Sequence, residues 1–324
     1  MTFTFQRRTI LASLSGWLLG AGFGVLGLQT PDPAGAQPAA DRDGGLVVAT
    51  LHPLLTDVAR QIGGEHVTVI GLMQPGQDPH DFRPTSADMT RLRSAHVVLV
   101  SGKGMELYLD DLRDNLRPGQ ILIEAGRDVP SLLIDARDEL FVCCPAHSVG
   151  SLDPHWWHSV RGMRRAVRSI GRAFEEADPA RAGVYRQRAD AYSGHLNQLH
   201  RWVQSELRRV PRNQRILATA HAAFNYLCRD YGFRALPVQG LNREAEVSSS
   251  YLQEAVGQIR DQRVPVIFRE HLSHPRGIEA IVRATGVRVG GELVADGSAR
   301  GIETYEQMVR HNVRTILRGF GIEE

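Results

Sequence analysis

The stretch DPARAGVYRQRADAYSGHLNQLHRWVQSELRRV, residues 178–210, decides the architecture because it reads as one uninterrupted amphipathic helix in mid-chain. Asp178 followed by Pro179 is typical of a helix start, and Pro211 ends the pattern. Apolar residues recur along it at spacings of three and four: Tyr185, Ala189, Tyr192, Leu196, Leu199, Val203 and Leu207. At about 1.5 Å per residue, such a helix would extend roughly 46 Å and would join two lobes rigidly.

On both sides of this helix, short apolar runs alternate with stretches of helical periodicity, as in β/α units on a parallel sheet. Before it the expected strands are 46–51, 67–72, 97–101 and 121–123, with helices near 53–62, 85–94 and 105–116. After it the expected strands are 216–220, 235–238, 264–268 and 287–289. The sequence therefore predicts an α/β fold of two (β/α) lobes, each with a four-stranded parallel sheet, joined by one long helix.

The first forty residues differ from the rest of the chain. Arg7 and Arg8 precede an apolar run at 10–28, and Ala34-Gly35-Ala36 follows, which is typical of a secretory signal. The paired arginines also fit a twin-arginine signal, so both export routes stay open. A retained membrane anchor is the less favoured alternative. No cysteine follows the apolar run, so a lipid anchor is not indicated.

The resulting domain organisation has five parts. We expect a signal peptide at 1–36, a flexible segment at 37–45, an N-terminal lobe at 46–177, a linking helix at 178–210 and a C-terminal lobe at 211–324. The exported product would be periplasmic, and we expect it to be a monomer.

Composition narrows the class of partner. A hydrophobic fraction of 42% and a charged fraction of 23% are those of a soluble globular protein. The formal net charge of +2 argues against a nucleic-acid-binding surface, which needs a concentrated basic excess.

Cys143, Cys144 and Cys228 are too few for a disulfide scaffold. One disulfide, or buried thiols, is favoured over a vicinal metal site at Cys143-Cys144.

Two loops share the tripeptide Asp-Pro-His, at 78–80 and at 153–155. Proline restricts the loop backbone, so the following His80 or His155 can be presented in one orientation, and the aspartate can accept from a ring or backbone N–H. A third candidate, His221, follows the strand expected at 216–220, and Asp296 follows the last strand. Open α/β sheets bind ligands at the carboxyl ends of their strands, so these four side chains are expected to converge.

Three neutral imidazoles and one carboxylate form a closed, four-coordinate set that suits Zn²⁺. Metal capture needs deprotonated imidazoles, so the affinity should fall as the pH drops below the histidine range. A single histidine would be a weak candidate in a chain with 13 of them, and Asp296 before a glycine is equally consistent with a simple turn.

The chain resembles the metal-binding solute-binding proteins of zinc and manganese ABC transporters (the cluster A-I periplasmic zinc-binding family) from about Leu46 to the C-terminus. The segments that carry the resemblance are PGQDPHDFRPTSADM (75–89), LDPHWWHSV (152–160), TAHAAFNYLCRDYGF (219–233), GLNREAEVSS (240–249), LVADG (293–297) and YEQMVRHNVRTI (305–316). The resemblance implies two lobes joined by a long helix, with one metal in the cleft. It also implies His80 and His155 as ligands from the first lobe and His221 and Asp296 as ligands from the second.

The resemblance further implies that the metal is delivered to an ABC permease in the inner membrane, and that the protein is not an enzyme. Manganese members tend to carry a carboxylate at the position of His221, so the imidazole favours Zn²⁺. Mn²⁺ or iron is the alternative cargo. The His-rich loop of many zinc members is missing, because the interval before His155 holds only Cys143, Cys144 and His147.

Two further residues near these motifs are ambiguous. His158 follows His155 by three residues, a spacing that would put both on one face of a helix, and other family members usually lack a histidine there. We expect it to face solvent or support the ligands, and a role as an alternate ligand is less favoured. Glu270, in Arg269-Glu270-His271, is expected to support the cleft, and direct coordination of the metal is the less favoured alternative. His52, His66, His96, His147, His195, His200 and His311 are interpreted as surface, cap or core residues.

A zinc hydrolase and an adhesin are the alternatives to a metal carrier. A zinc hydrolase needs an open coordination position and a general base, and no HExxH motif is present. An adhesin would need an exposed aromatic patch or a repeat, and the sequence supplies neither.

Overall fold

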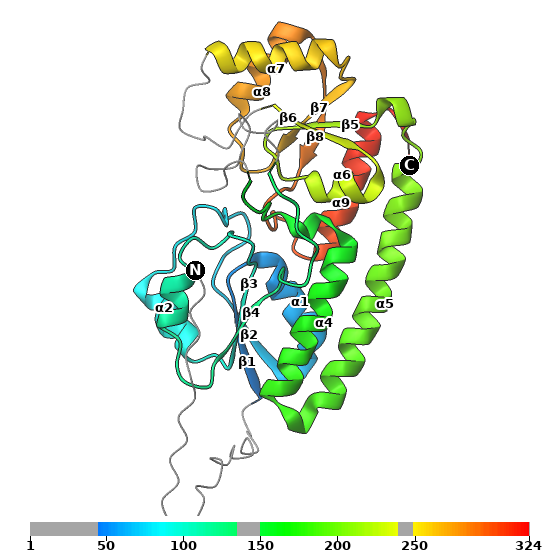
Figure 1. Ribbon diagram of the computed structural model, residues 1–324. Coiled ribbons are helices and arrows are strands. Elements are labelled where there is room, and N and C mark those ends of the chain that lie inside the picture. Colours follow the sequence, from blue (N-terminus) through cyan, green and yellow to red (C-terminus); the bar gives the residue numbers. More distant parts are fainter. Residues whose placement is uncertain (1–44, 135–149, 239–248, 324) are drawn as a thin grey trace, which may run out of the picture. The chain divides into compact units, whose positions relative to one another are not determined.

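The computed structural model describes residues 45–134, 150–238 and 249–323, which contain two four-stranded parallel sheets (Figure 1). The first sheet has the order β2-β1-β3-β4 and consists of β1 (Leu46–Thr50), β2 (Val67–Gly71), β3 (Val97–Val100) and β4 (Ile121–Glu124). The second has the order β6-β5-β7-β8 and consists of β5 (Ile216–Thr219), β6 (Arg234–Pro237), β7 (Val266–Glu270) and β8 (Arg288–Leu293). We call the regions built around them the first lobe and the second lobe. The predicted α/β class with two four-stranded sheets is confirmed.

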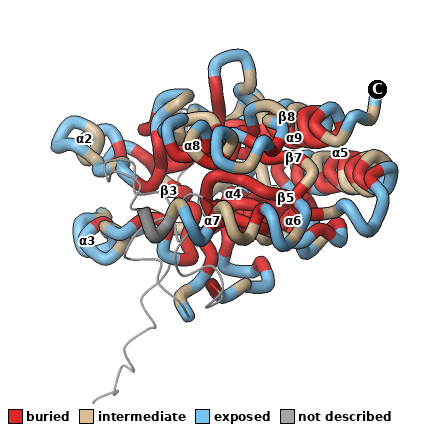
Figure 2. Tube along the Cα trace, turned by 90° about the horizontal axis from the view of Figure 1, so that it is seen from above, coloured by how far each residue is buried: buried red, intermediate tan, exposed pale blue. Residues whose placement is uncertain are grey.

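Helices cover both sheets. The first lobe contains α1 (Pro53–Gly63), α2 (Ser86–Arg93), α3 (Leu109–Asp114) and α4 (Val160–Ala177). The second contains α6 (Asn225–Tyr231), α7 (Ser249–Asp261), α8 (Pro275–Thr285) and α9 (Tyr305–Gly319). Strands β3 and β5 are buried along their whole length, as expected for parallel strands with both faces covered, whereas α2 and α3 are largely exposed (Figure 2).

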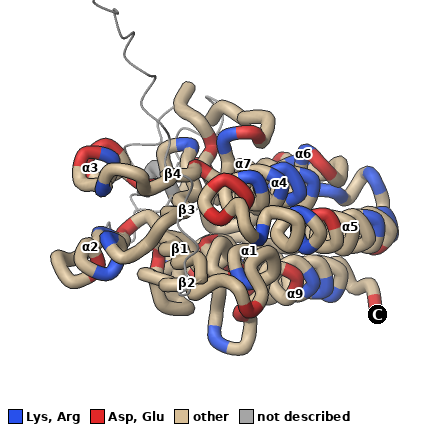
Figure 3. Tube along the Cα trace, turned by 90° about the horizontal axis from the view of Figure 1, so that it is seen from below, with Lys and Arg blue, Asp and Glu red and all other residues tan. Residues whose placement is uncertain are grey.

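The long helix α5 (Ala182–Leu207) packs against α1 and α4 of the first lobe and α9 of the second. Six of the seven stripe residues are buried, and Tyr192 is half-buried. Helix α4 approaches α5 closely, because a Cβ at Gly171 would lie 2.8 Å from the Cβ of Ala189. Basic and acidic residues are interspersed along α5 and α9 (Figure 3). The predicted joining helix is therefore present.

The helix starts later than its sequence suggests. A 3-10 turn, Pro179–Arg181, precedes α5, and Asp178 makes no capping hydrogen bond to it. The Asp178 carboxylate instead accepts from the Tyr185 hydroxyl at 2.7 Å and from the Arg181 guanidinium at 3.1 Å. The Asp-Pro signal marks a helical turn correctly, but the Asp178 side chain bonds Tyr185 and Arg181 instead of capping that turn.

Two other predicted boundaries are wrong. The helix expected at 105–116 is reduced to α3, because the preceding loop turns through Gly102 and Lys103 at positive φ and is held by Glu106. The Glu106 carboxylate accepts the backbone N–H groups of Ser101 and Gly102 at 2.6 and 2.9 Å. Strand β8 continues past the expected end at residue 289, because Gly290 leaves room for the ring of Phe268.

Among the residues that the structure describes, no helix has the length and apolarity needed to span a bilayer. The segment expected to be a signal peptide and the flexible segment after it fall outside the described residues, apart from Gly45.

Candidate metal centre

Each of the four candidate residues follows a strand of one of the two parallel sheets. His80 lies in the connection after β2, and His155 lies between β4 and α4. His221 comes two residues after the end of β5, and Asp296 comes three residues after the end of β8. Two side chains therefore come from each lobe.

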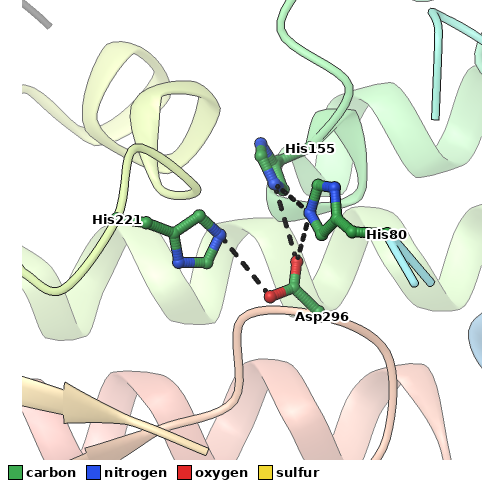
Figure 4. Close-up of side chains that lie close together, drawn as sticks. All are labelled: His80, His155, His221 and Asp296. Atoms are coloured by element: carbon green, nitrogen blue, oxygen red, sulfur yellow. Dashed lines mark hydrogen bonds and ion pairs between the residues drawn. The ribbon is translucent and has the colours of Figure 1, made fainter. Parts of the chain in front are cut away.

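The four side chains meet at one point (Figure 4). One candidate ligand atom from each lies within 4.8 Å of all the others. The Nε2 atoms of His80 and His155 are 3.2 Å apart. Asp296 Oδ1 lies 3.5 Å from His80 Nε2 and 3.6 Å from His155 Nε2, and Asp296 Oδ2 lies 3.5 Å from His221 Nε2.

This cluster is closed to solvent and has the dimensions of a metal site. The exposed fractions of His80, His155, His221 and Asp296 are 8%, 2%, 1% and 3%. Buried polar atoms normally have partners, yet His221 Nε2 and Asp296 Oδ1 make no hydrogen bond within the described residues. Four donors placed tetrahedrally at about 2.0–2.2 Å from Zn²⁺ would be about 3.3–3.6 Å apart. The residues present therefore fit a four-coordinate divalent cation.

The repeated Asp-Pro-His tripeptides orient the two histidines of the first lobe. Asp153 Oδ1 accepts the backbone N–H of His155 at 2.9 Å and lies 2.9 Å from Nδ1 of the same ring. With its Nδ1–H donated to Asp153, the His155 ring presents the Nε2 lone pair to the cluster. In the other loop, Asp78 Oδ1 accepts the backbone N–H of His80 at 2.8 Å.

Glu270, the last residue of β7, holds His221 in the second lobe. Its carboxylate accepts the backbone N–H of His221 at 3.0 Å and also accepts a hydrogen bond from Nδ1 of the ring. This leaves Nε2 of His221 facing the cluster. Glu270 thus lies on the side of His221 away from the cluster, and its carboxylate accepts both of its hydrogen bonds from that residue.

The segment before Asp296 is fixed within its own lobe. The side chain of Asn312 in α9 accepts from the N–H of Val294 and donates to its carbonyl, both at 2.8 Å. Gly297 has φ +94°, which favours glycine, and a Cβ there would lie 3.3 Å from Cγ of Pro53. The glycine does shape a turn, and that turn carries Asp296 into the cluster.

Burial and mutual charge set the proton affinities of the cluster. Burial lowers the pKa of His155 to about 4, although Asp153 opposes this. Burial also disfavours a charged His221, but the carboxylates of Glu270 and Asp296 outweigh it and raise the pKa of His221 well above its usual value. Burial would raise the pKa of Asp296, but His221 and His80 hold that pKa well below its usual value. Without metal, His221 therefore retains a proton that a divalent cation would displace.

Two further buried histidines, His52 and His158, lie beside the cluster and are not among its four members. His52 caps α1 through its Nδ1, as one of the expected roles allowed, and its ring lies 4.6 Å from that of Trp157. His158 is 3% exposed and does not face solvent. His52 comes two residues after the end of β1, as His221 does after β5, and this shared position could have drawn attention to it.

The remaining candidates lie elsewhere. Cys143, Cys144 and His147 fall outside the described residues, and Cys228 is buried in α6. His271 lies 3.3 Å from Glu292. His274 caps α8.

Comparison with known proteins gives the same class. The family model of the zinc-uptake complex component A, periplasmic (ZnuA), matches residues 47–319. The manganese-binding lipoprotein MntA of Bacillus subtilis is 32% identical over 311 residues, covering 93% of this chain and 96% of MntA. The iron-binding protein YfeA of Yersinia pestis is 29% identical over 277 residues, covering 85% and 86% of the two chains.

A solved structure agrees with these sequence matches. The periplasmic zinc-binding protein TroA of Treponema pallidum superposes with a TM-score of 0.76 at 28% identity, covering 86% of this chain and 99% of TroA. The chain therefore belongs to the ZnuA family of metal-binding ABC transporter substrate-binding proteins. Members of this family bind metal ions for transport and are not enzymes.

Proposed function

We propose that this protein is an extracytoplasmic solute-binding protein that binds Zn²⁺ through His80, His155, His221 and Asp296 and delivers it to an ABC permease in the inner membrane. The convergence of three imidazole nitrogens and one carboxylate within 4.8 Å, in a buried position between the lobes, carries the proposal. Transport, rather than catalysis, is what family membership indicates.

Zinc is favoured over manganese and iron by the chemistry of the donors. Imidazole nitrogen suits Zn²⁺, and sites of this kind bind Zn²⁺ more tightly than Mn²⁺ or Fe²⁺. Three nitrogens and one oxygen also complete a tetrahedral zinc shell. Relatives are named for manganese, iron and zinc, so manganese or iron is the alternative cargo.

Export to the periplasm is part of the proposal and is supported by the sequence of residues 1–36. The family description and TroA are both termed periplasmic. We infer that the protein acts as a monomer, and that the permease releases the metal by drawing the ligands of one lobe away from those of the other. Modest lobe motion is expected, because α5 packs against helices of both lobes.

Native mass spectrometry of the exported form with added Zn²⁺ and Mn²⁺ tests the function directly. We expect one zinc ion per chain and displacement of Mn²⁺ by an equal concentration of Zn²⁺. His221→Ala should lose the zinc, whereas His200→Ala should retain it, because His200 hydrogen-bonds Tyr231 and is not part of the cluster. Retention of stoichiometric zinc by His221→Ala, or displacement of Zn²⁺ by Mn²⁺, would contradict the proposal.

A further inference from the structure

The backbone carbonyl of Ala295 receives two hydrogen bonds from the opposite lobe. Trp157 Nε1 donates to it at 2.9 Å, and His158 Nε2 lies at 2.9 Å from the same oxygen. A carbonyl oxygen has two lone pairs and can accept both bonds. We call this pair of contacts the Ala295 clamp.

To donate a hydrogen bond to the Ala295 carbonyl, His158 must carry a proton on Nε2, and a neutral imidazole can do so. Burial lowers the pKa of His158 to about 3, so the imidazole is neutral near pH 7 and carries one N–H. The carbonyl is only an acceptor, so that N–H lies at Nε2. This assigns the direction of the bond from His158 to Ala295.

His158 also contacts the other metal-site loop of the second lobe. Its ring lies against Phe224, with centroids 4.4 Å apart and an interplanar angle of 36°. Phe224 follows His221 by three residues. One side chain of the first lobe therefore touches both second-lobe segments that carry candidate ligands, although His158 is not among the four atoms of the cluster.

The clamp acts next to a candidate ligand. Asn312 fixes Val294 within the second lobe, and the clamp fixes Ala295 from the first lobe, so the backbone leading to Asp296 is held from both sides. Moving Asp296 away from His80 and His155 requires either that the clamp break or that this backbone deform. The clamp therefore opposes the motion that would open the metal site.

We propose that His158 is a positioning residue that, with Trp157, holds Asp296 in place across the lobe interface and so sets how slowly the cleft releases its metal. This inference rests on the proposed function, because Asp296 must be a ligand for release to depend on it. His158 itself does not bind the metal.

The test compares zinc release into excess chelator, followed by stopped flow, for the wild type and three variants. His158→Leu should release zinc about fivefold faster, the change expected for loss of one hydrogen bond of ordinary net strength. His158→Gln retains an amide donor and should restore most of the slow release. Trp157→Phe removes the other hydrogen bond of the clamp and should also accelerate release. If His158→Leu does not fold, Trp157→Phe takes its place in the comparison.

A matched control is His200→Leu, which removes a half-buried histidine bonded to Tyr231 and should release zinc at the wild-type rate. Release from His158→Leu at the wild-type rate would overturn the inference. Equal acceleration in His158→Leu and His158→Gln would also overturn it, because the hydrogen bond would then not be the cause.

A measurement on metal-free protein separates the inference from the proposed function. Hydrogen exchange of the backbone amides at 295–298 should be faster in His158→Leu than in the wild type and close to wild type in His158→Gln. Unchanged exchange in His158→Leu would reject the clamp even where zinc binds with one equivalent. Absence of zinc binding by the wild type would instead reject the proposed function, and with it the role in release.

Discussion

The carboxylate of Glu270 holds His221 by two hydrogen bonds, one from the backbone N–H and one from Nδ1 of the ring. The sheet itself creates this relationship, because His221 follows β5 and Glu270 ends β7, and β5 and β7 are neighbouring parallel strands. A carboxylate in this position fixes the ring orientation and increases the basicity of the free nitrogen.

Replacing that carboxylate should weaken metal binding without removing a ligand. Glu270→Gln keeps the shape and an acceptor oxygen but loses the negative charge, so we expect zinc affinity to fall about 10- to 100-fold. Competition with a chelator of known affinity measures this. The matched control is Glu292→Gln, which changes a carboxylate of the same lobe that pairs with His271 and lies outside the cluster. Equal affinities for Glu270→Gln and the control would contradict the role assigned to Glu270.

Zinc affinity should fall as the solution becomes more acidic. The raised pKa of His221 means that the metal-free site holds a proton, and zinc must displace it to bind. Each displaced proton lowers the apparent affinity about tenfold per pH unit of acidification, below the pKa of the group that carries it. Titrations at pH 7.5 and 5.5 should therefore differ clearly, and indistinguishable affinities would refute proton displacement.

The metal-free fold should lose stability in acid partly through His52. Burial lowers the pKa of His52 to about 3 in the folded state, whereas the unfolded chain protonates near 6.5. The contribution of the neutral His52 to stability is complete above pH 6.5 and is lost as the pH falls from 6.5 towards the folded-state pKa of about 3. His52→Asn keeps a capping side chain and removes the titrating ring.

Urea unfolding of the wild type and His52→Asn at several pH values measures this effect. We expect the loss of unfolding free energy between pH 6.5 and 4.5 to be smaller in His52→Asn by roughly 1–3 kcal/mol. The slope with pH is the diagnostic quantity, because loss of the contact with Trp157 lowers stability by a similar amount at every pH. Parallel pH profiles for the two proteins would exclude His52 as a source of acid sensitivity.

The glycine in β8 should resist enlargement. A Cβ at Gly290 would lie 2.5 Å from Cε1 of Phe268 and 2.6 Å from Cγ2 of Val266, so Gly290→Val should destabilise the protein by about 1–3 kcal/mol or more. Gly194→Ala in the interior of α5 is the matched control. A Cβ there meets no atom within 4 Å, and the change should stabilise by up to about 1 kcal/mol. Thermal unfolding distinguishes the two, and similar melting temperatures would show that the second lobe adapts to the larger side chain.

Local sequence patterns were sufficient to predict the elements whose formation depends on the periodicity of apolar residues. Alternating strand and helix periodicities predicted both sheets, and the stripe at three- and four-residue spacing predicted α5. They failed at Asp178, in the loop held by Glu106 and at Gly290, because each outcome depends on a specific side-chain contact rather than on periodicity. In β8, Gly290 leaves space for the ring of Phe268 and does not end the strand.

The sequence by itself determined the two-lobed α/β architecture and the four side chains that meet between the lobes, because parallel strands bring their carboxyl ends to one edge and proline stiffens the Asp-Pro-His loops. Only the tertiary structure decided what holds those side chains. His158 and Ala295 are separated by 137 residues, yet they share a hydrogen bond across the lobe interface. Periodicity reports which face of an element is buried, whereas a bond between two loops depends on how the lobes pack around α5.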